Sequence, residues 1–111
     1  MSDLARDVVK LPGWRWLRGM KVFGAAGDGL GFERVRKRDE APKAAGWLDL
    51  DDSPTGCALL ELLEGRIEAT RDGLGGWRLS DVSHEVYSDT LGQACARLAK
   101  LRGHWGRDDA S

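Results

Sequence analysis

The residue types that most often carry catalysis are present, but they do not form a catalytic set. His84 and His104 are twenty positions apart, and neither has a second His or Cys at the spacing of metal ligands. Asp81, Ser83 and His84 are close in sequence, yet no serine stands in a GxSxG turn. General acid–base work also needs a positioned pocket, and nothing in the sequence marks one. We therefore predict no catalytic residue, no bound cofactor, no metal site and no enzymatic activity.

Two further segments resemble ligand loops only superficially. The glycine-rich GAAGDGLG at 24–31 lacks the GxxxxGK[ST] pattern of a phosphate loop, and no helix signal follows it, so a turn is predicted. The acidic LDLDDSP at 48–54 lacks the ligand spacing of a calcium loop. Its acids suit the start of a helix, where negative charge is favourable.

A basic and aromatic region near the start of the chain carries a sharper signal. WRWLRGMK at 14–21 interleaves tryptophan with arginine and lysine, and RVRKR follows at 34–38. Aromatic side chains that stack bases, next to cations that neutralise phosphates, are typical of nucleic-acid binding. The same alternation also fits tryptophans in the core and arginines on the opposite, solvent face. Both interpretations stay open.

Five tryptophans in 111 residues are more than one small core easily hides. Tryptophan and arginine are favoured anchors of protein interfaces, so one or two of the five are expected at an interface. Combined with the basic residues, they give one candidate interaction surface. Its members are Trp14, Arg15, Trp16, Arg18, Lys21, Arg34, Arg36, Lys37, Arg38, Trp47 and Trp105.

Composition indicates one small globular domain. The chain has 41% hydrophobic and 32% charged residues, a net charge of −1 and no apolar run of membrane-spanning length. Its first ten residues lack a signal-peptide pattern, so a cytoplasmic location is expected and a membrane is not an expected partner. The two cysteines, Cys57 and Cys95, lie among apolar residues and are expected to be buried free thiols.

The small net charge hides a split along the chain. Residues 10–38 contain eight basic and two acidic side chains, whereas residues 49–89 contain ten acidic and three basic ones. Such a charge dipole steers a partner of opposite charge, and it also makes a homodimer possible. Two separately solvated faces are the simpler interpretation.

The elements that must position these residues follow from local patterns. Alternation predicts a hairpin over 14–35 and a second over 66–80. Ser53 is expected to cap a helix that begins at Pro54, and Thr90 and Gln93 have the spacing of a capping box, with Gly103 ending that second helix. The predicted fold is α+β, in the order ββ-α-ββ-α, with an antiparallel sheet of about four to five strands and two helices on one face. Residues 1–10 are expected to be a flexible tail or a short helical lead-in, 11–103 the domain, and 104–111 a C-terminal tail.

Three segments also carry a family resemblance. LPGWRWLRGM (11–20), DLDDSPTGCALLELL (49–63) and YSDTLGQACARLAKL (87–101), in this order, resemble a group of small proteins of tailed bacteriophages and prophages. The matching positions are Leu11, Pro12, Trp16, Gly19, Met20, Asp49, Asp52, Pro54, Thr55, Gly56, Cys57, Leu59, Leu60 and Trp77. The chain departs from the pattern at Ser53 and in its more basic RVRKRDEAPK segment. The resemblance implies a phage or prophage origin and brings no established activity.

Two functions remain. The first is a non-enzymatic phage-type protein that binds a host or phage protein, for example as a modulator or inhibitor of a host defence machine in the bacterial cytoplasm. The alternative is a nucleic-acid-binding accessory protein that uses the basic and aromatic N-terminal hairpin. The positions of the tryptophans relative to the 34–38 run distinguish them: exposed Trp14 and Trp16 favour nucleic acid, and an exposed Trp47 or Trp105 favours a protein.

Overall fold

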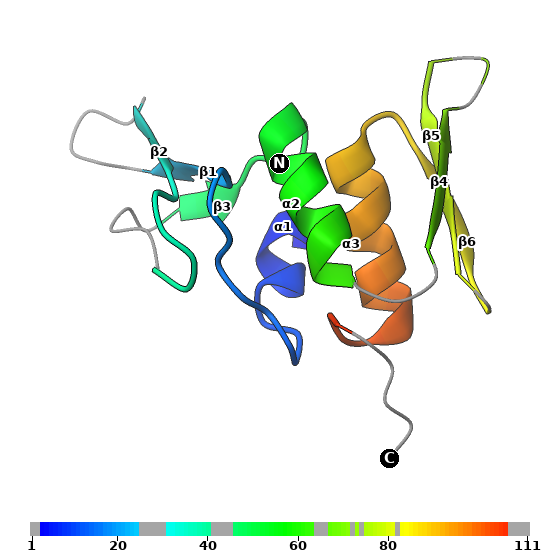
Figure 1. Ribbon diagram of the computed structural model, residues 1–111, viewed down its shortest axis with the longest axis horizontal. Coiled ribbons are helices and arrows are strands. Elements are labelled where there is room, and N and C mark those ends of the chain that lie inside the picture. Colours follow the sequence, from blue (N-terminus) through cyan, green and yellow to red (C-terminus); the bar gives the residue numbers. More distant parts are fainter. Residues whose placement is uncertain are drawn as a thin grey trace.

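A layer of three helices separates two small antiparallel sheets (Figure 1). The computed structural model describes residues 3–24, 31–40, 46–63, 67–71, 73, 75–81 and 83–106. The elements in chain order are α1 (Asp3–Val8), β1 (Lys21–Gly24), β2 (Gly31–Arg34), β3 (Gly46–Leu48), α2 (Ser53–Leu63), β4 (Glu68–Arg71), β5 (Trp77–Ser80), β6 (Glu85–Ser88) and α3 (Leu91–Arg102). Strands β2-β1-β3 form sheet A, and strands β4-β5-β6 form sheet B.

The α+β class is confirmed, but the predicted order and the single sheet of four to five strands are wrong. Each hairpin takes its third strand from the segment that follows it, β3 for sheet A and β6 for sheet B. The two hairpins therefore never pair with each other. Each sheet has an apolar side to bury, and the helix layer has two faces. One sheet therefore packs on each face of the helix layer, instead of a single sheet on one face.

Apolar residues at alternate positions of the strands decide which face of each sheet packs on the helices. In sheet A, Val22 of β1 and Leu48 of β3 are directly paired and are 1% and 2% exposed. In sheet B, Leu79 of β5 and Val86 of β6 are paired and buried, and both strands pack on α3. Because neighbouring residues of a strand point to opposite faces, the next residues along β1 and β6 face outward.

Helix α2 begins one residue earlier than the sequence suggested. Asp52, not Ser53, is the capping residue: its carboxylate accepts the Thr55 N–H at 3.1 Å, and its carbonyl accepts the Gly56 N–H at 2.9 Å. The buried Thr55 hydroxyl donates to the same carboxylate and accepts the Lys21 N–H, both at 2.8 Å. The start of α2 is thereby fastened to β1.

The expected ends of α3 are confirmed. The Thr90 hydroxyl accepts the Gln93 N–H, and Gly103, with φ of 82°, donates its N–H to the Ala99 carbonyl. Near its start, α3 crosses α2 at very short range. A Cβ on Gly92 would lie 2.0 Å from the Leu50 carbonyl oxygen, and one on Gly56 would lie 3.0 Å from the Gly92 nitrogen.

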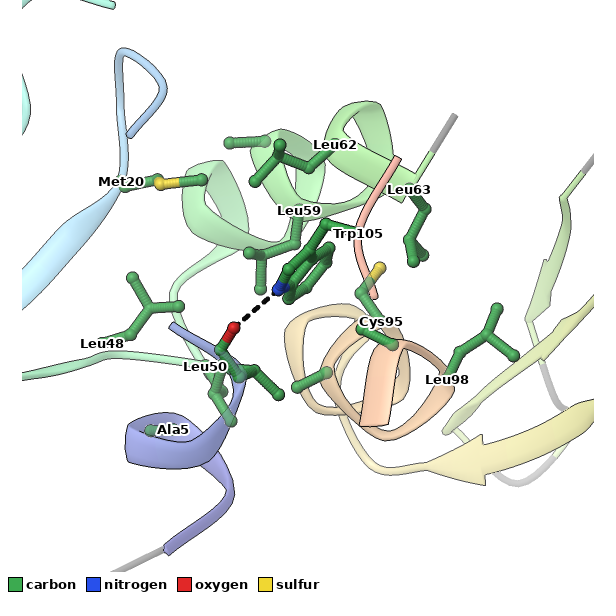
Figure 2. Packing of buried hydrophobic residues seen from close by; sticks show 14 of the residues in the cluster. Ala5, Met20, Leu48, Leu50, Leu59, Leu62, Leu63, Cys95, Leu98 and Trp105 are labelled. Carbon is green, nitrogen blue, oxygen red and sulfur yellow. Dashed lines mark hydrogen bonds between the residues drawn. The ribbon is translucent and has the colours of Figure 1, made fainter. Parts of the chain in front are cut away.

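Both predicted tails contain packed structure. Ala5 and Val8 of α1 are buried, and Trp105 is only 3% exposed. Figure 2 shows the Trp105 ring between the leucines of α2 and Cys95 of α3, with its indole N–H donating to the Val8 carbonyl at 2.7 Å. Residues 1–2 and 107–111 lie outside the described residues. In the described part of the chain, no helix has the length and apolar character needed to cross a bilayer.

Candidate functional site

The tryptophans near the start of the chain face inward. Trp14 makes edge-to-face contacts with Trp16 and Trp105, with ring centroids 5.1 Å and 5.4 Å apart. Trp14 and Trp16 are partly buried against the core, and Trp105 is inside it. The placement of Trp105 on an interaction surface is therefore wrong, because its ring is needed to close the core. The side chain of Trp47 lies outside the described residues, although its backbone belongs to β3.

A tight turn presents Arg18 to solvent. The Met20 N–H donates to the Leu17 carbonyl at 3.3 Å, and Gly19 between them has φ of 99°, which only glycine adopts easily. Gly19 then donates to the Val35 carbonyl, while the Val35 N–H donates to the Met20 carbonyl. This is the pattern of a G1 bulge, in which two residues of one strand face one of its neighbour. It places exposed Arg18 beside the end of β2.

Two basic residues of the predicted surface are used to hold the fold. The Arg34 guanidinium donates to the Gly19 carbonyl at 2.7 Å and to both carboxylate oxygens of Asp52 at 2.9 and 3.2 Å. This hydrogen bonding raises the pKa of Arg34 and lowers the pKa of Asp52. Lys21 lies 3.6 Å from the carboxylate of Asp49. Both cations are therefore partly neutralised where β1 and β2 meet the start of α2.

A clamped turn carries the remaining cations of the 34–38 run. Asp39 adopts a left-handed backbone with φ of 64°, and its N–H donates to the Trp16 carbonyl at 2.6 Å. Its carboxylate receives two hydrogen bonds from Arg15, at 2.9 and 2.6 Å. The hydrogen bonds from Arg15 hold the pKa of Asp39 below its usual value. Arg15 therefore positions the turn and is not part of a free cationic surface.

Four exposed cations remain together, and we call them the basic rim: Arg18, Arg36, Lys37 and Arg38. Arg18 and Arg36 line one open groove of about 610 Å³, whose other walls are Gly19, Glu33, Arg34 and Val35. Within the described residues, no salt bridge joins any rim side chain to a carboxylate. Of the predicted surface, these four are the basic residues that the structure brings together in solvent.

Phe23 is an exposed aromatic residue that the sequence analysis missed. Phe23 of β1 is 38% exposed, on the face of sheet A opposite to buried Val22, and the Lys21 ammonium lies 5.2 Å from its ring centroid. Local alternation over 21–23 was the available signal. This signal was obscured because the predicted strand began at Trp14, so the tryptophans were taken as the aromatic residues of the strand. In the structure, residues 14–20 form no strand, and β1 starts only at Lys21.

The residues considered for catalysis have structural partners. The Asp81 carboxylate accepts the N–H groups of Ser83 and His84 at 2.7 and 2.6 Å, which shapes the turn between β5 and β6. Burial opposes ionisation of Asp81, but these hydrogen bonds prevail and its pKa is lowered. Among the residues that the structure describes, no group of three or more His, Cys, Asp or Glu side chains is arranged to hold a metal ion.

The two cysteines have different environments. Cys95 is buried, and burial raises the pKa of its thiol. Cys57 is exposed, which corrects the expectation of two buried thiols; the residues of α2 beside it, Gly56 and Ala58, take the buried positions. Cys57 lines a second cavity of about 300 Å³ between the starts of α2 and α3, with Arg71 and Trp77 on its wall.

Comparison with protein families, with curated proteins and with solved structures finds no match to this chain. The geometry of sheet A and its basic rim is therefore the basis for the function considered next.

Proposed function

We propose that this protein is a non-enzymatic nucleic-acid-binding accessory protein whose basic rim holds phosphate groups. The observation that carries the proposal is the gathering of Arg18, Arg36, Lys37 and Arg38 in solvent, while Arg15 and Arg34 are held by Asp39 and Asp52. The fold thus uses part of its positive charge for structure and leaves four exposed cations, of which Arg18 and Arg36 line one groove. Lysine and arginine side chains that neutralise phosphates supply most of the affinity in such complexes.

The clamped turn supports this function in a second way. Three of the rim cations, Arg36, Lys37 and Arg38, lie on a turn fixed by the Arg15–Asp39 pair and by the hydrogen bond to Trp16. A turn that is ordered before binding loses less conformational entropy when a ligand arrives. The stacking role expected for Trp14 and Trp16 is not part of the proposal, because both rings pack against the core.

A protein partner, the function expected first from the sequence, is the second candidate. Tyr87 of β6 is 53% exposed on sheet B, directly paired with Arg78 of β5. Tyrosine and arginine are the side chains that most often anchor protein interfaces. The phage origin, the action on a host defence machine and the cytoplasmic location stay predictions.

The experiment is a binding titration by fluorescence anisotropy with labelled DNA, from about 50 mM to about 200 mM salt. We expect binding that weakens steeply with salt. The triple variant Arg36→Ala, Lys37→Ala, Arg38→Ala is expected to bind more weakly, with a salt slope lower by about two to three. A control triple removes three exposed cations elsewhere, Lys10→Ala, Arg97→Ala and Lys100→Ala, and should keep the wild-type slope.

The outcomes show whether the basic rim binds phosphates and whether it prefers them to carboxylates. If the rim triple and the control triple behave alike, the basic rim does not bind phosphates and the proposal is wrong. Polyglutamate serves as an acidic protein-like competitor in the same titration. Displacement of DNA by polyglutamate at equal charge concentration would favour an acidic protein partner over a nucleic acid, because carboxylates would then satisfy the rim as well as phosphates do.

A further inference from the structure

The proposed function does not involve the second cavity, which lies where the starts of α2 and α3 meet the β4–β5 hairpin (Figure 1). Its volume of about 300 Å³ is at the lower end of the range for ligand sites. Three segments of the chain contribute to its wall, with Asp51 and Asp52 before α2, Arg71 and Trp77 from the hairpin, and Asp89 and Thr90 before α3. A space of this size suits one small planar group.

Arg71 and Trp77 form a flat part of this wall. They are directly paired in the register of β4 and β5, and the Arg71 guanidinium lies over the Trp77 ring, with its central carbon 5.2 Å from the ring centroid. Arg71 is exposed, whereas Trp77 is partly buried and packs against the core. Unpaired bases stack on aromatic rings and on guanidinium planes. The wall therefore favours a planar aromatic ligand.

The Asp51 carboxylate is a fixed hydrogen-bond acceptor on the same cavity. Its Oδ1 accepts the Thr90 hydroxyl at 3.2 Å and the Gln93 side-chain amide at 2.7 Å. Its Oδ2 accepts no hydrogen bond from the residues that the structure describes. Because an ionised carboxylate only accepts hydrogen bonds, it selects a ligand that carries N–H donors on its edge.

Among the nucleobases, guanine matches such an acceptor best. Its N1–H and N2–H₂ groups are adjacent donors, whereas the single N–H of thymine lies between two carbonyl oxygens that a carboxylate repels. Adenine and cytosine each place one amino donor beside a ring nitrogen that is an acceptor. The negative charges of Asp51 and Asp89 also disfavour entry of a phosphate. The cavity therefore suits the base of a nucleotide and not its phosphate.

The cavity and the open groove beside the basic rim meet at one ion pair. Arg34 lines the groove and Asp52 lines the cavity, and the guanidinium donates to the two carboxylate oxygens at 2.9 and 3.2 Å. Gly19 of the groove also faces the first turn of α2, since a Cβ there would lie 3.9 Å from Pro54. A strand whose phosphates lie along the groove therefore has the cavity beside it.

We propose that the second cavity binds one unpaired guanine base of a nucleic-acid strand whose phosphates contact the basic rim. This inference rests on the proposed function and names its ligand more narrowly, as single-stranded nucleic acid that contains guanine. The base stacks on the wall formed by Arg71 and Trp77, and its N1–H and N2–H₂ groups donate to Asp51. Pairing with cytosine would occupy the same two donors, so a guanine within a duplex does not bind in this way.

The test measures the fluorescence anisotropy of labelled oligothymidylates of about 12 nucleotides, with guanine or thymine at the central position. We expect the guanine oligonucleotide to bind about 5- to 150-fold more tightly, the range for one bidentate base contact. Inosine, which lacks the N2 amino group, should bind with intermediate affinity, whereas 7-deazaguanine, which keeps both donors, should bind like guanine. Annealing to the complementary strand should abolish the preference.

Variants of the cavity wall locate the preference. Asp51→Asn keeps an oxygen for Thr90 and Gln93 but presents an N–H₂ group in place of the open oxygen. It is expected to remove the guanine preference, while binding of the all-thymine strand and its salt slope stay at wild type. Trp77→Leu, which keeps an apolar side chain without a π face, should reduce the preference. The matched control Glu61→Gln neutralises an exposed carboxylate of α2 outside the cavity and should keep the wild-type preference.

Each result decides one point. Loss of the guanine preference in Asp51→Asn but not in Glu61→Gln supports the pocket. A preference that survives in Asp51→Asn, or that is absent from the wild type while the rim triple still weakens binding, overturns the pocket and leaves the proposed function standing. An equal preference in the duplex overturns the assignment to unpaired guanine. No binding of any oligonucleotide at low salt overturns both proposals.

Discussion

Asp52 is the single residue on which the geometry near the basic rim depends most. Its carboxylate caps α2 through the Thr55 N–H, accepts the Thr55 hydroxyl and receives two hydrogen bonds from Arg34. Arg34 also holds the Gly19 carbonyl, so the turn that presents Arg18 is tied to the same carboxylate. One acidic side chain therefore connects a helix start, a strand and a bulge.

Acid is expected to destabilise the protein partly through Asp52. Its pKa is lowered in the folded state, first by the hydrogen bonds from Arg34. A carboxyl group with a depressed folded pKa contributes stability above its unfolded pKa of about 4, and this contribution is lost as the pH falls through the folded pKa. Asp52→Asn keeps an acceptor at the cap but cannot titrate.

The measurement is urea unfolding of wild type and Asp52→Asn at about pH 6 and about pH 3. We expect the variant to be less stable than wild type at the higher pH, and the difference to shrink at the lower pH. Equal losses of unfolding free energy in the two proteins on acidification would show that Asp52 does not contribute to acid sensitivity. Asp81, whose pKa is also lowered, remains titratable in both proteins.

At the scale of single residues, the sequence predicts those roles that depend only on residues nearby in the chain. Thr90 and Gly103 were identified as the ends of α3 because capping involves residues three or four positions apart. Asp52 was missed in favour of Ser53, since both residue types cap helices and the contact of Asp52 with Arg34, 18 positions away, is not visible in the local sequence. Exposure of Phe23 and burial of Trp105 likewise depend on residues far away in sequence.

At the scale of elements, α2 and α3 make the most extensive contact between helices in the part of the chain that the structure describes. Gly56 faces the start of α3, and Gly92 faces the Leu50 carbonyl just before α2. The buried residues of both helices surround this point, and the Cys95 thiol lies 3.9 Å from the Gly56 carbonyl oxygen. The absence of side chains at the two glycines is what allows the helix starts to approach so closely.

Gly92→Ala is expected to destabilise the protein severely. The added Cβ would lie 2.0 Å from the Leu50 carbonyl oxygen, a contact with backbone that cannot move aside without separating the helices. The expected cost is about 3 kcal/mol or more, at the upper end for overpacking. Chemical unfolding of the variant measures this cost directly.

Gly103→Ala is the matched comparison for this substitution. Gly103 has φ of 82°, but no atom lies within 4 Å of its added Cβ, so only backbone strain of about 1–2 kcal/mol is expected. If the two variants lose the same unfolding free energy, the close approach at Gly92 is not as rigid as the structure indicates.

The pairing of the strands was harder to predict from the sequence than the ends of α3. Each hairpin was located by its local alternation, yet β3 is only three residues long and β6 only four. A third strand joins a sheet because its apolar residue, Leu48 or Val86, finds a buried position on the helix layer. That requirement appears only when the elements are assembled.

At the scale of the whole molecule, the charge split of the sequence is partly neutralised within one chain. The Arg34–Asp52 and Lys21–Asp49 pairs join the basic first part of the chain to the acidic middle part. Sheets A and B lie on opposite sides of the helix layer, so exposed Phe23 and exposed Tyr87 belong to separate surfaces (Figure 1). A homodimer through opposed charges stays a prediction, which sedimentation at low and high salt checks.

Trp105 is expected to be essential for global stability. Its ring is buried between α2 and α3, and its indole N–H is bonded to the Val8 carbonyl of α1. Trp105→Ala should cost about 3–5 kcal/mol, and Trp105→Phe about 1–3 kcal/mol because the Val8 carbonyl loses its partner. Tyr87→Ala, at an exposed position, should change the free energy of unfolding by no more than about 0.5 kcal/mol.

Thermal or urea unfolding of the three variants provides the comparison. A Trp105→Ala protein as stable as Tyr87→Ala would mean that the chain beyond α3 is dispensable for the core. Equal stability of Trp105→Phe and wild type would assign the contribution of Trp105 to packing alone, without the hydrogen bond to α1.

The position of Trp105 also has a consequence for synthesis of the protein. Helix α1 leaves the ribosome before α2 and α3, but the indole that closes its packing is 97 positions later than Val8, to which it is bonded. Until that residue has emerged, the nascent chain cannot complete its core and keeps apolar surface of α1 and α2 open. Completion of the fold therefore waits for the synthesis of Trp105, and a chain released before that residue would be a substrate for chaperones and proteases.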